Sequence, residues 1–240
     1  MNNIAICFVG TARSLEHTHI NIKKNLVDSV GECDILAFLA QNEHSSKFQK
    51  YFHNDKRVKE VIEEKEPDYN LDGINFLDEW PFSPTSSRQV YIKMINSRKR
   101  MGEILSSYEA QNEIVYDKVI FSRLDVKYFD DVGSYVNDIA LDSLCIPDFH
   151  NTFGGVINGF NDRFAVGNRG NMGTYFNIPN SITPYNKTGG KICAENLLKY
   201  HLEVNEVLVE KLPIRFTRVR PNGDAIDMRL ANQILEPRDT

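Results

Sequence analysis

Residues 116–126 read YDKVIFSRLDV, a short apolar run that leads into Arg123 and, two residues later, into Asp125. The apolar run predicts a buried strand. Because side chains alternate between the two faces of a strand, Arg123 and Asp125 are expected on the same face, side by side where the strand ends. A cation beside a carboxylate that can bind a metal suits a diphosphate and its divalent ion.

The chain before this stretch begins with a strand, a helix and a second strand. The apolar residues 4–9 favour a first core strand that ends at Gly10. Residues 14–30 favour an amphipathic helix, because Ser14 can cap it and apolar side chains follow at helical spacings. Residues 34–40 are apolar enough for a fully buried second strand. Together they predict a right-handed strand, helix, strand unit.

Residues 41–87 are less regular and predict only a short strand at 58–62. The segment Trp80-Pro81-Phe82-Ser83-Pro84 is either a lid or wall beside a nucleotide pocket or a surface excursion. Residues 88–108 predict a long helix that packs on the sheet, because one stripe of side chains recurs at intervals of three and four. The stripe consists of Tyr91, Met94, Ile95, Arg98, Met101, Leu105 and Tyr108.

The rest of the chain predicts a short strand at 144–147, a tight turn and a buried strand within 159–167, helices at 171–176 and 194–202, and a final strand at 212–220. The final strand carries Arg215, Arg218 and Arg220 on it or near it. Glycine and asparagine are dense between residues 151 and 171. Glycines there allow either a close backbone approach to a ligand or a left-handed turn.

This alternation of strands and helices predicts an α/β fold, with a layered sheet flanked by helices. A chain of 240 residues with 41% hydrophobic content is ample for one core and marginal for two. We therefore expect a single domain over residues 1–220, followed by a C-terminal extension or the start of a linker at 221–240.

The composition limits which partners and which cellular compartment we expect for this protein. A net charge of -5 and a pI near 5.7 make nucleic acid an unexpected partner. Four widely spaced cysteines without a C-x-x-C pair are expected as buried free thiols in a reducing compartment. The apolar N-terminal run is too short for a signal sequence, and no basic residue precedes it. No run reaches the roughly 18 apolar residues of a membrane span, so we expect a soluble, cytoplasmic protein.

Four motifs, taken in order, resemble the small glycosyltransferases of the GT-A fold. They are FVGTAR at 8–13, YDKVIFSRLDV at 116–126, NDRF at 161–164 and AENLL at 194–198. Similar chains occur in capsule and lipopolysaccharide loci and in large DNA viruses of algae, for which the cytoplasm would be that of the host. The resemblance covers most of residues 1–220. It implies a three-layer sandwich whose mostly parallel central sheet is flanked by helices.

The resemblance also implies which residues hold the donor. In that family the first strand and its turn hold the nucleoside, which assigns Gly10, Thr11 and Arg13 to the nucleotide sugar. A D-x-D motif at the end of a middle strand holds the divalent ion, but this chain reads R-x-D. Asp125 alone would then bind Mn²⁺ or Mg²⁺, with water and phosphate oxygens completing the shell. The alternative is that Arg123 and Asp125 form a local ion pair at the strand end.

The chemistry of sugar transfer also requires positive groups beside the diphosphate. Breaking the bond between sugar and nucleotide passes through an oxocarbenium-like transition state and leaves two negative charges on the diphosphate. Asp125 with a metal ion, together with Arg13 and Arg123, can stabilise these charges. One arginine near the C-terminus can also help to stabilise the negative charges of the diphosphate. A bare surface position is the alternative for Arg13.

An inverting transferase also needs a carboxylate that removes the proton of the acceptor hydroxyl. Asp162 is the first candidate, with capping of a turn as its alternative role. Glu195 is the second, and in the first turn of a helix an acid also favours the helix dipole. The resulting prediction is a transferase that moves a hexose from its UDP-sugar to a glycan or glycoprotein acceptor.

Two other functions remain open at this point. A sugar-nucleotide nucleotidylyltransferase has a similar fold, although it would carry more glycine after the first strand and a lysine soon after. A catalytically silent domain that binds a nucleotide sugar or glycan would keep the pocket without a working base. The sequence shows no P-loop, no G-x-S-x-G elbow and no histidine pair at metal-binding spacing, so kinase, hydrolase and histidine-metal functions lose support.

Overall fold

A computed structural model describes residues 3–78, 85–139, 142–153 and 157–225 of the chain. Its centre is a seven-stranded sheet with the strand order β10-β6-β9-β4-β1-β2-β3. The strands are β1 (Ile4–Gly10), β2 (Asp34–Ala40), β3 (Val58–Glu64), β4 (Lys118–Arg123), β6 (Leu144–Pro147), β9 (Phe164–Asn168) and β10 (Val209–Leu212). Strand β9 is antiparallel to β4 and β6, and the other pairs are parallel. The predicted mostly parallel sheet is confirmed.

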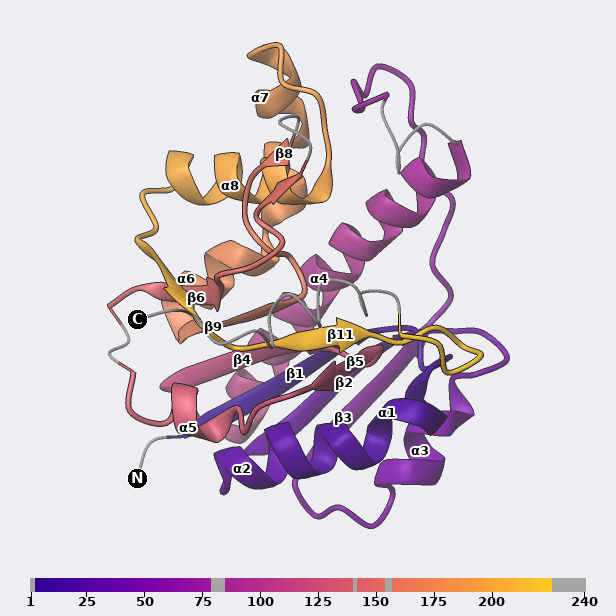
Figure 1. The fold of residues 1–240 in the computed structure, drawn as a ribbon, viewed down its shortest axis with the longest axis vertical. Helices are drawn as coiled ribbons and strands as arrows, with labels where there is room; N and C mark the ends of the chain where they lie inside the picture. The colour runs from indigo at the N-terminus through magenta and orange to yellow at the C-terminus, as the bar shows by residue number, and fades with distance from the viewer. Residues whose placement is uncertain (1–2, 79–84, 140–141, 154–156, 226–240) are drawn as a thin grey trace, which may run out of the picture.

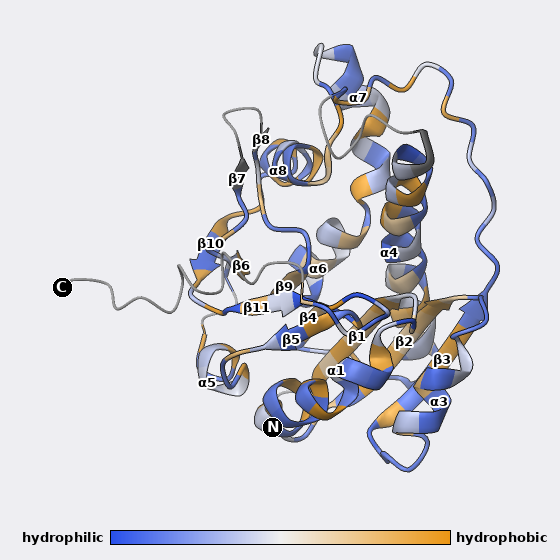
Figure 2. Cartoon of the chain, turned by 45° about the vertical axis from the view of Figure 1, so that its right-hand side comes forward, coloured by the Kyte–Doolittle hydropathy of each residue, from blue (hydrophilic) through white to orange (hydrophobic). Residues whose placement is uncertain are grey.

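Each face of the sheet carries its own hydrophobic cluster. Along β1, Ala5, Cys7 and Val9 lie in one cluster, and Ile6 and Phe8 lie in the other. A central parallel strand that is buried on both faces needs a continuous apolar run, which is why β1 and β2 were recognisable in the sequence. Figure 2 shows both strands largely in the hydrophobic colours.

The helices that follow β1 and β2, together with a short later helix, cover the face that carries Ile6 and Phe8 (Figure 1). Helix α1 (Leu15–Ile22) continues through a π-helical turn (Lys23–Val27) into α2 (Asp28–Val30), and α3 (Ser46–Phe52) and α5 (Gly133–Val136) pack beside them. The helix predicted over residues 14–30 is confirmed, with one turn wound more widely than an α-helix. It ends at Gly31, whose φ of 89° is unfavourable for other residues.

The opposite face is covered by α4 (Thr85–Asn112), α6 (Arg169–Phe176) and α8 (Ala194–Val204). A 3₁₀ helix (Ile178–Ser181) and α7 (Ile182–Lys187) connect the last two. Helix α4 packs on β1 and β2, and Figure 1 shows its N-terminal end extending beyond the sheet. The two helical layers and the sheet between them form the predicted three-layer sandwich.

The single strand predicted for residues 212–220 is wrong. Strand β10 ends at Leu212 on the edge of the sheet, and a separate strand, β11 (Phe216–Arg218), pairs in antiparallel fashion with β5 (Val126–Tyr128). Pro213 follows β10 directly, and a proline has no N–H group with which to extend the ladder. The break brings the C-terminal part of the chain beside the segment that follows β4. A further short pair, β7 (Thr152–Phe153) and β8 (Ile157–Asn158), lies outside the central sheet.

The remaining expectations concern the whole chain. All four cysteines are buried and free, as predicted. Within the part of the chain that the structure describes, every helix is too short or too polar to cross a membrane. The segment Trp80-Pro81-Phe82-Ser83-Pro84, considered above as a lid or wall, lies outside the described residues.

Candidate functional site

A cavity of about 220 Å³ opens where β1, β2 and β4 end. In α/β sheets, ligands bind outside the carboxyl ends of parallel strands, so the cavity has the expected position for a site. The five residues that the sequence assigned to a nucleotide sugar all line it. They are Gly10, Thr11, Arg13, Arg123 and Asp125. The structure thus brings them together, while their binding of a nucleotide sugar stays a prediction.

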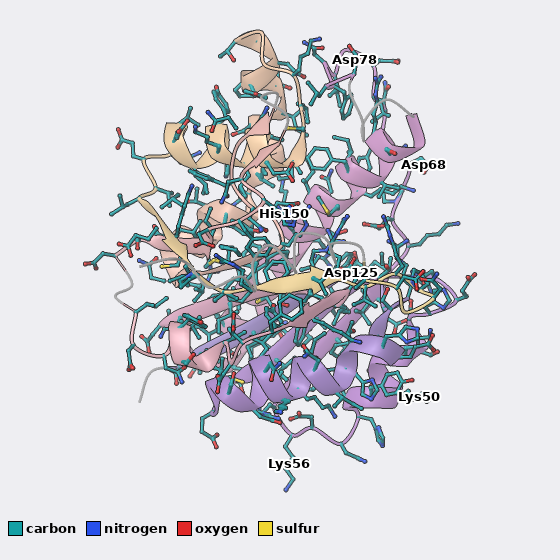
Figure 3. All side chains as sticks on the ribbon, viewed as in Figure 1. Lys50, Lys56, Asp68, Asp78, Asp125 and His150 are labelled. Carbon is teal, nitrogen blue, oxygen red and sulfur yellow. The ribbon has the colours of Figure 1, made fainter. Side chains whose placement is uncertain are left out.

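Arg123 and Asp125 form a two-point ion pair in this cavity. Arg123 Nε lies 2.8 Å from Asp125 Oδ1, and Nη2 lies 2.7 Å from Oδ2. Strand β4 ends at Arg123, and Asp125 follows in the bend before β5. Burial opposes the charge on Asp125, but Arg123, and beyond it Arg218 and Arg13, hold the pKa of its carboxyl below the usual value. Figure 3 shows Asp125 at the middle of the molecule beside β11, far from surface residues such as Lys50.

The residues around Asp125 do not fit the divalent ion that the D-x-D resemblance implies. Hard cations take several oxygen ligands. Both oxygens of Asp125 already accept hydrogen bonds from Arg123. In the described ranges, no group of three or more His, Cys, Asp or Glu residues is placed to hold a metal ion. A cation at Asp125 would have to displace one arginine and stay close to others.

Arg98 is a residue of this cavity that sequence reasoning missed. It lies in α4, lines the cavity and is fully buried. Its Nη2 donates to both the backbone carbonyl and Oδ2 of Asp162, at 2.6 Å each. The guanidinium also packs on the rings of Phe121 and Tyr175, whose centroids lie 5.1 and 5.5 Å from its central carbon. The signal was a charged residue within an otherwise largely apolar helical stripe.

Asp162 therefore lies behind the cavity, bound to Arg98. It sits in the loop before β9, where the buried side chain of Asn161 accepts from the Arg163 N–H at 3.0 Å and fixes the turn. Burial opposes the ionisation of Asp162, but the arginines at 98, 163 and 123 outweigh it and lower its pKa to about 2. This carboxylate stays ionised at neutral pH and is a weak base.

Glu195 lies in the first turn of α8, and its environment has the opposite effect. Its side chain is buried, and Arg163 Nη2 lies 3.7 Å from Oε1. Burial, followed by the negative charge of Asp162, raises the pKa of Glu195 to about 7. The two predicted catalytic acids are thus close enough to influence each other, with very different affinities for a proton.

Gly159 holds the loop against the start of α8. A Cβ atom at Gly159 would lie 2.1 Å from the backbone carbonyl carbon of Glu195, a distance that no side chain tolerates. The next residue, Phe160, donates its N–H to the Glu195 carbonyl at 3.1 Å. The two roles left open for glycines in this region were approach to a ligand and a left-handed turn, whereas Gly159 approaches the backbone of Glu195.

Of the three arginines near the C-terminus, Arg218 belongs to the site. In β11 it pairs with Val126, and the N–H of Val219 donates to the Asp125 carbonyl at 2.8 Å. Its charge lowers the pKa values of both Asp125 and Glu195. Arg215 instead forms an ion pair with Asp148.

The cavity and the acids behind it carry an excess of positive charge. Five arginines (Arg13, Arg98, Arg123, Arg163 and Arg218) act on three acids (Asp125, Asp162 and Glu195), which leaves two positive charges in excess when all three acids are ionised. Lys93, which also lines the cavity, forms an ion pair with Asp68 at 2.6 Å, and the acid Glu66 in the lining reduces the excess to one positive charge. This excess stands out in a chain whose net charge is -5.

A second cavity of about 590 Å³ lies between α6, α7 and α8. Its described lining residues are neutral and include Ser181 and His201, whose Oγ and Nδ1 atoms are 2.7 Å apart. Burial lowers the pKa of His201, which keeps the ring uncharged at neutral pH. The described lining of this second cavity therefore has no charged side chain that could bind a diphosphate, and we assign the candidate site to the smaller cavity.

Three solved structures to which this chain is similar are glycosyltransferases in name. The galactosyltransferase LgtC, in complex with donor and acceptor sugar analogs, is 12% identical with a TM-score of 0.50, over 86% of this chain and 72% of that one. GlyE from Streptococcus pneumoniae TIGR4 is 12% identical with a TM-score of 0.46, over 88% of this chain and 45% of that one. Mouse xyloside xylosyltransferase 1 is 12% identical with a TM-score of 0.47, over 88% of this chain and 85% of that one.

At this identity the comparison with LgtC shows the fold alone, and it confirms the GT-A architecture predicted from the sequence. The chain spans less than half the length of GlyE. No curated protein matches the sequence. A family model described as "Domain of unknown function (DUF7796)" matches residues 1–220, and the chain therefore belongs to this family.

Proposed function

We propose that the chain is a glycosyltransferase that takes a hexose from its UDP-sugar and passes it to a glycan or glycoprotein acceptor. The observation that carries this proposal is the cavity at the carboxyl ends of β1, β2 and β4. It gathers Gly10, Thr11, Arg13, Arg123 and Asp125 in a GT-A sheet. Its excess of positive charge suits a diphosphate. A bacterial capsule or viral setting in the cytoplasm remains part of the proposal.

Arginines provide the groups that stabilise the departing diphosphate. The bond between the anomeric carbon and the diphosphate oxygen breaks, and the oxygen keeps the electron pair. Arg123 is held in place by the carboxylate of Asp125, so its guanidinium is oriented before the donor arrives. Arg13 lines the same cavity. Asp125 thus positions a cation, which is the role its geometry supports.

Glu195 is the stronger candidate for the base. A general base works best when its pKa is close to the working pH, and the pKa of Glu195 is about 7. Asp162, ranked first in the sequence, has a pKa near 2 and is held by Arg98. In the proposed reaction, the acceptor hydroxyl gives its proton to Glu195 while its oxygen attacks the anomeric carbon from the side opposite the diphosphate, which inverts the sugar.

A screen of nucleotide sugars tests this function. Purified protein is incubated with each nucleotide sugar, and slow hydrolysis or transfer to added glycans is followed by mass spectrometry. We expect turnover with one UDP-hexose, a strong loss in Glu195→Gln and normal turnover in Glu203→Gln. Glu203 is a matched control because it lies on the same helix with its side chain 58% exposed. Failure of the wild type to bind or turn over any nucleotide sugar contradicts the proposal.

A catalytically silent nucleotide-sugar-binding domain is the second candidate. It is favoured by the fact that both acids lie near an arginine, since Arg98 binds Asp162 and Arg163 lies 3.7 Å from Glu195. The same screen separates the two functions. A silent domain binds a nucleotide sugar without consuming it, and Glu195→Gln then binds the donor with the affinity of the wild type.

A further inference from the structure

We propose that buried arginines take the place of a divalent ion in this site, with Arg98 as the residue that binds the diphosphate from the floor of the cavity. The inference rests on the proposed function, because it assumes that the ligand is a nucleoside diphosphate sugar. It differs from the D-x-D expectation in one respect that can be measured. Donor binding and turnover are independent of Mn²⁺ and Mg²⁺.

The first argument is the hydrogen bonding of Arg98. This side chain is 0% exposed, and its Nε and Nη1 atoms have no hydrogen-bond partner among the described residues. A buried guanidinium normally uses its donors, because each unpaired polar group in the interior costs about 1–3 kcal/mol. Arg98 lines the cavity, so an oxygen of a bound ligand can accept from these two groups after a small adjustment.

The second argument is the closeness of two like charges. Arg98 Nη2 lies 3.9 Å from the sulfur of Met94, and Arg123 Nη1 lies 3.4 Å from the same atom. Two cations that contact one sulfur, one of them buried and the other half-buried, repel each other. A diphosphate between them relieves this repulsion and has acceptor oxygens for both. The same Met94 lines the cavity, which places this pair of cations at its wall.

The third argument is the balance of charge. Asp162 neutralises Arg98 and Asp125 neutralises Arg123, while Arg13, Arg163 and Arg218 remain against Glu195. With Glu66 of the lining counted as well, one positive charge remains in excess, and it opposes the negative charges of the diphosphate. Arg–phosphate contacts can also be bidentate, so they give orientation as well as charge.

The test is calorimetric titration of the wild-type protein with UDP and with uridine. Each titration is done in EDTA and again in excess Mn²⁺. We expect UDP to bind much more tightly than uridine, with the same affinity in both buffers. UDP binding that appears only with Mn²⁺ overturns this inference and leaves the transferase proposal standing. Absence of UDP binding in both buffers overturns both.

Single substitutions test whether Arg98 is the arginine that binds the diphosphate. In Arg98→Met, UDP affinity in EDTA should fall by about 10- to 100-fold, the value of one or two charge-assisted hydrogen bonds, while uridine affinity changes little. Arg100→Met is the matched control, because Arg100 lies on the same helix and pairs with Glu64 and Glu103 at the surface. An equal loss for uridine and UDP in Arg98→Met would show a merely structural role and contradict the inference.

Because Arg98→Met leaves Asp162 buried without a partner, this variant can fail to fold. The double variant Arg98→Met/Asp162→Asn removes both charges, and circular dichroism reports whether it is folded. It should show the same selective loss of UDP affinity. Arg13→Gln gives an independent measurement, since Arg13 lines the cavity at a partly exposed position, and it should weaken UDP but not uridine. Unchanged UDP affinity in these variants overturns the inference.

Discussion

The guanidinium of Arg123 binds both carboxylate oxygens of Asp125, two residues further along the chain, at 2.8 and 2.7 Å. The side-by-side placement follows from the end of β4, because Arg123 is the last residue of the strand and Asp125 follows in the bend before β5. It converts a position that resembles a metal ligand into a support for a cation. The predictions below depend on this relationship and on the acids behind it.

Asp125→Ala should impair the site by releasing Arg123. The buried guanidinium loses its partner, and breaking a buried pair in this way costs about 3 kcal/mol of the free energy of unfolding. UDP affinity should fall about tenfold because Arg123 is no longer oriented. Urea denaturation and calorimetry measure the two effects. UDP affinity that rises with Mn²⁺ in the wild type but not in Asp125→Ala would instead assign Asp125 to a metal.

The turnover number should rise with pH through about 7. Glu195 must be deprotonated to accept the proton of the acceptor, and its pKa is about 7. Glu195→Gln should lose about 10²- to 10⁴-fold in kcat and the pH dependence with it. The measurement is kcat between pH 5.5 and 8.5 under saturating donor. A profile that is flat in the wild type, or unchanged in Glu195→Gln, would assign the base elsewhere.

The two acids should affect stability in opposite directions with pH. The pKa of Asp162 is lowered from 3.8, so its contribution is present above that value and is lost as the pH falls through about 2. The pKa of Glu195 is raised from 4.5, so its contribution is present below that value and is lost as the pH rises through about 7.

The pH dependence of both contributions can be measured by urea denaturation of the variants at pH 5 and pH 8. At pH 8, Glu195→Gln should be more stable than the wild type by roughly 2 kcal/mol, because a buried charge is removed. The gain should be smaller at pH 5. Asp162→Asn should be less stable than the wild type at both values, because it leaves Arg98 unpaired. A Glu195→Gln variant that is destabilised more at pH 8 than at pH 5 contradicts the assignment.

Gly159→Ala should displace the start of α8 and reduce activity. The new Cβ would lie 2.1 Å from the carbonyl carbon of Glu195, so the loop and the helix must separate. We expect a loss of several kcal/mol in stability and a fall in kcat larger than any rise in KM for the donor. Gly170→Ala is the matched control, because its Cβ would meet only the Asn168 side chain at 3.4 Å. Normal kcat in a folded Gly159→Ala protein would remove Glu195 from the reaction.

Local sequence patterns were sufficient for the sheet and for part of the site. Strands β1, β2 and β4 are buried on both faces and therefore appear as apolar runs. The family resemblance and the chemistry of sugar transfer assigned Gly10 and Arg123 to the same ligand, and both line one cavity.

Long-range contacts explain what the sequence could not provide. Arg98 joined a helical stripe that was assigned to packing, and its partner Asp162 is 64 residues away. The high pKa of Glu195 depends on burial, and on an acid in a different loop. The prediction of one strand over residues 212–220 also failed at long range, because Phe216 to Arg218 pairs with β5 rather than continuing β10.

The central claim is that the cavity at the ends of β1, β2 and β4 binds a nucleoside diphosphate sugar through its arginines. The most direct measurement is calorimetric titration of a panel of nucleotide sugars against the wild type and Arg123→Met, with Arg57→Met as control because Arg57 pairs with Asp28 and Asp55 outside the cavity. The account predicts saturable binding of one nucleotide sugar to the wild type and to Arg57→Met, weakened at least tenfold in a folded Arg123→Met protein. Absence of binding by the wild type, or equal binding by all three proteins, would contradict it.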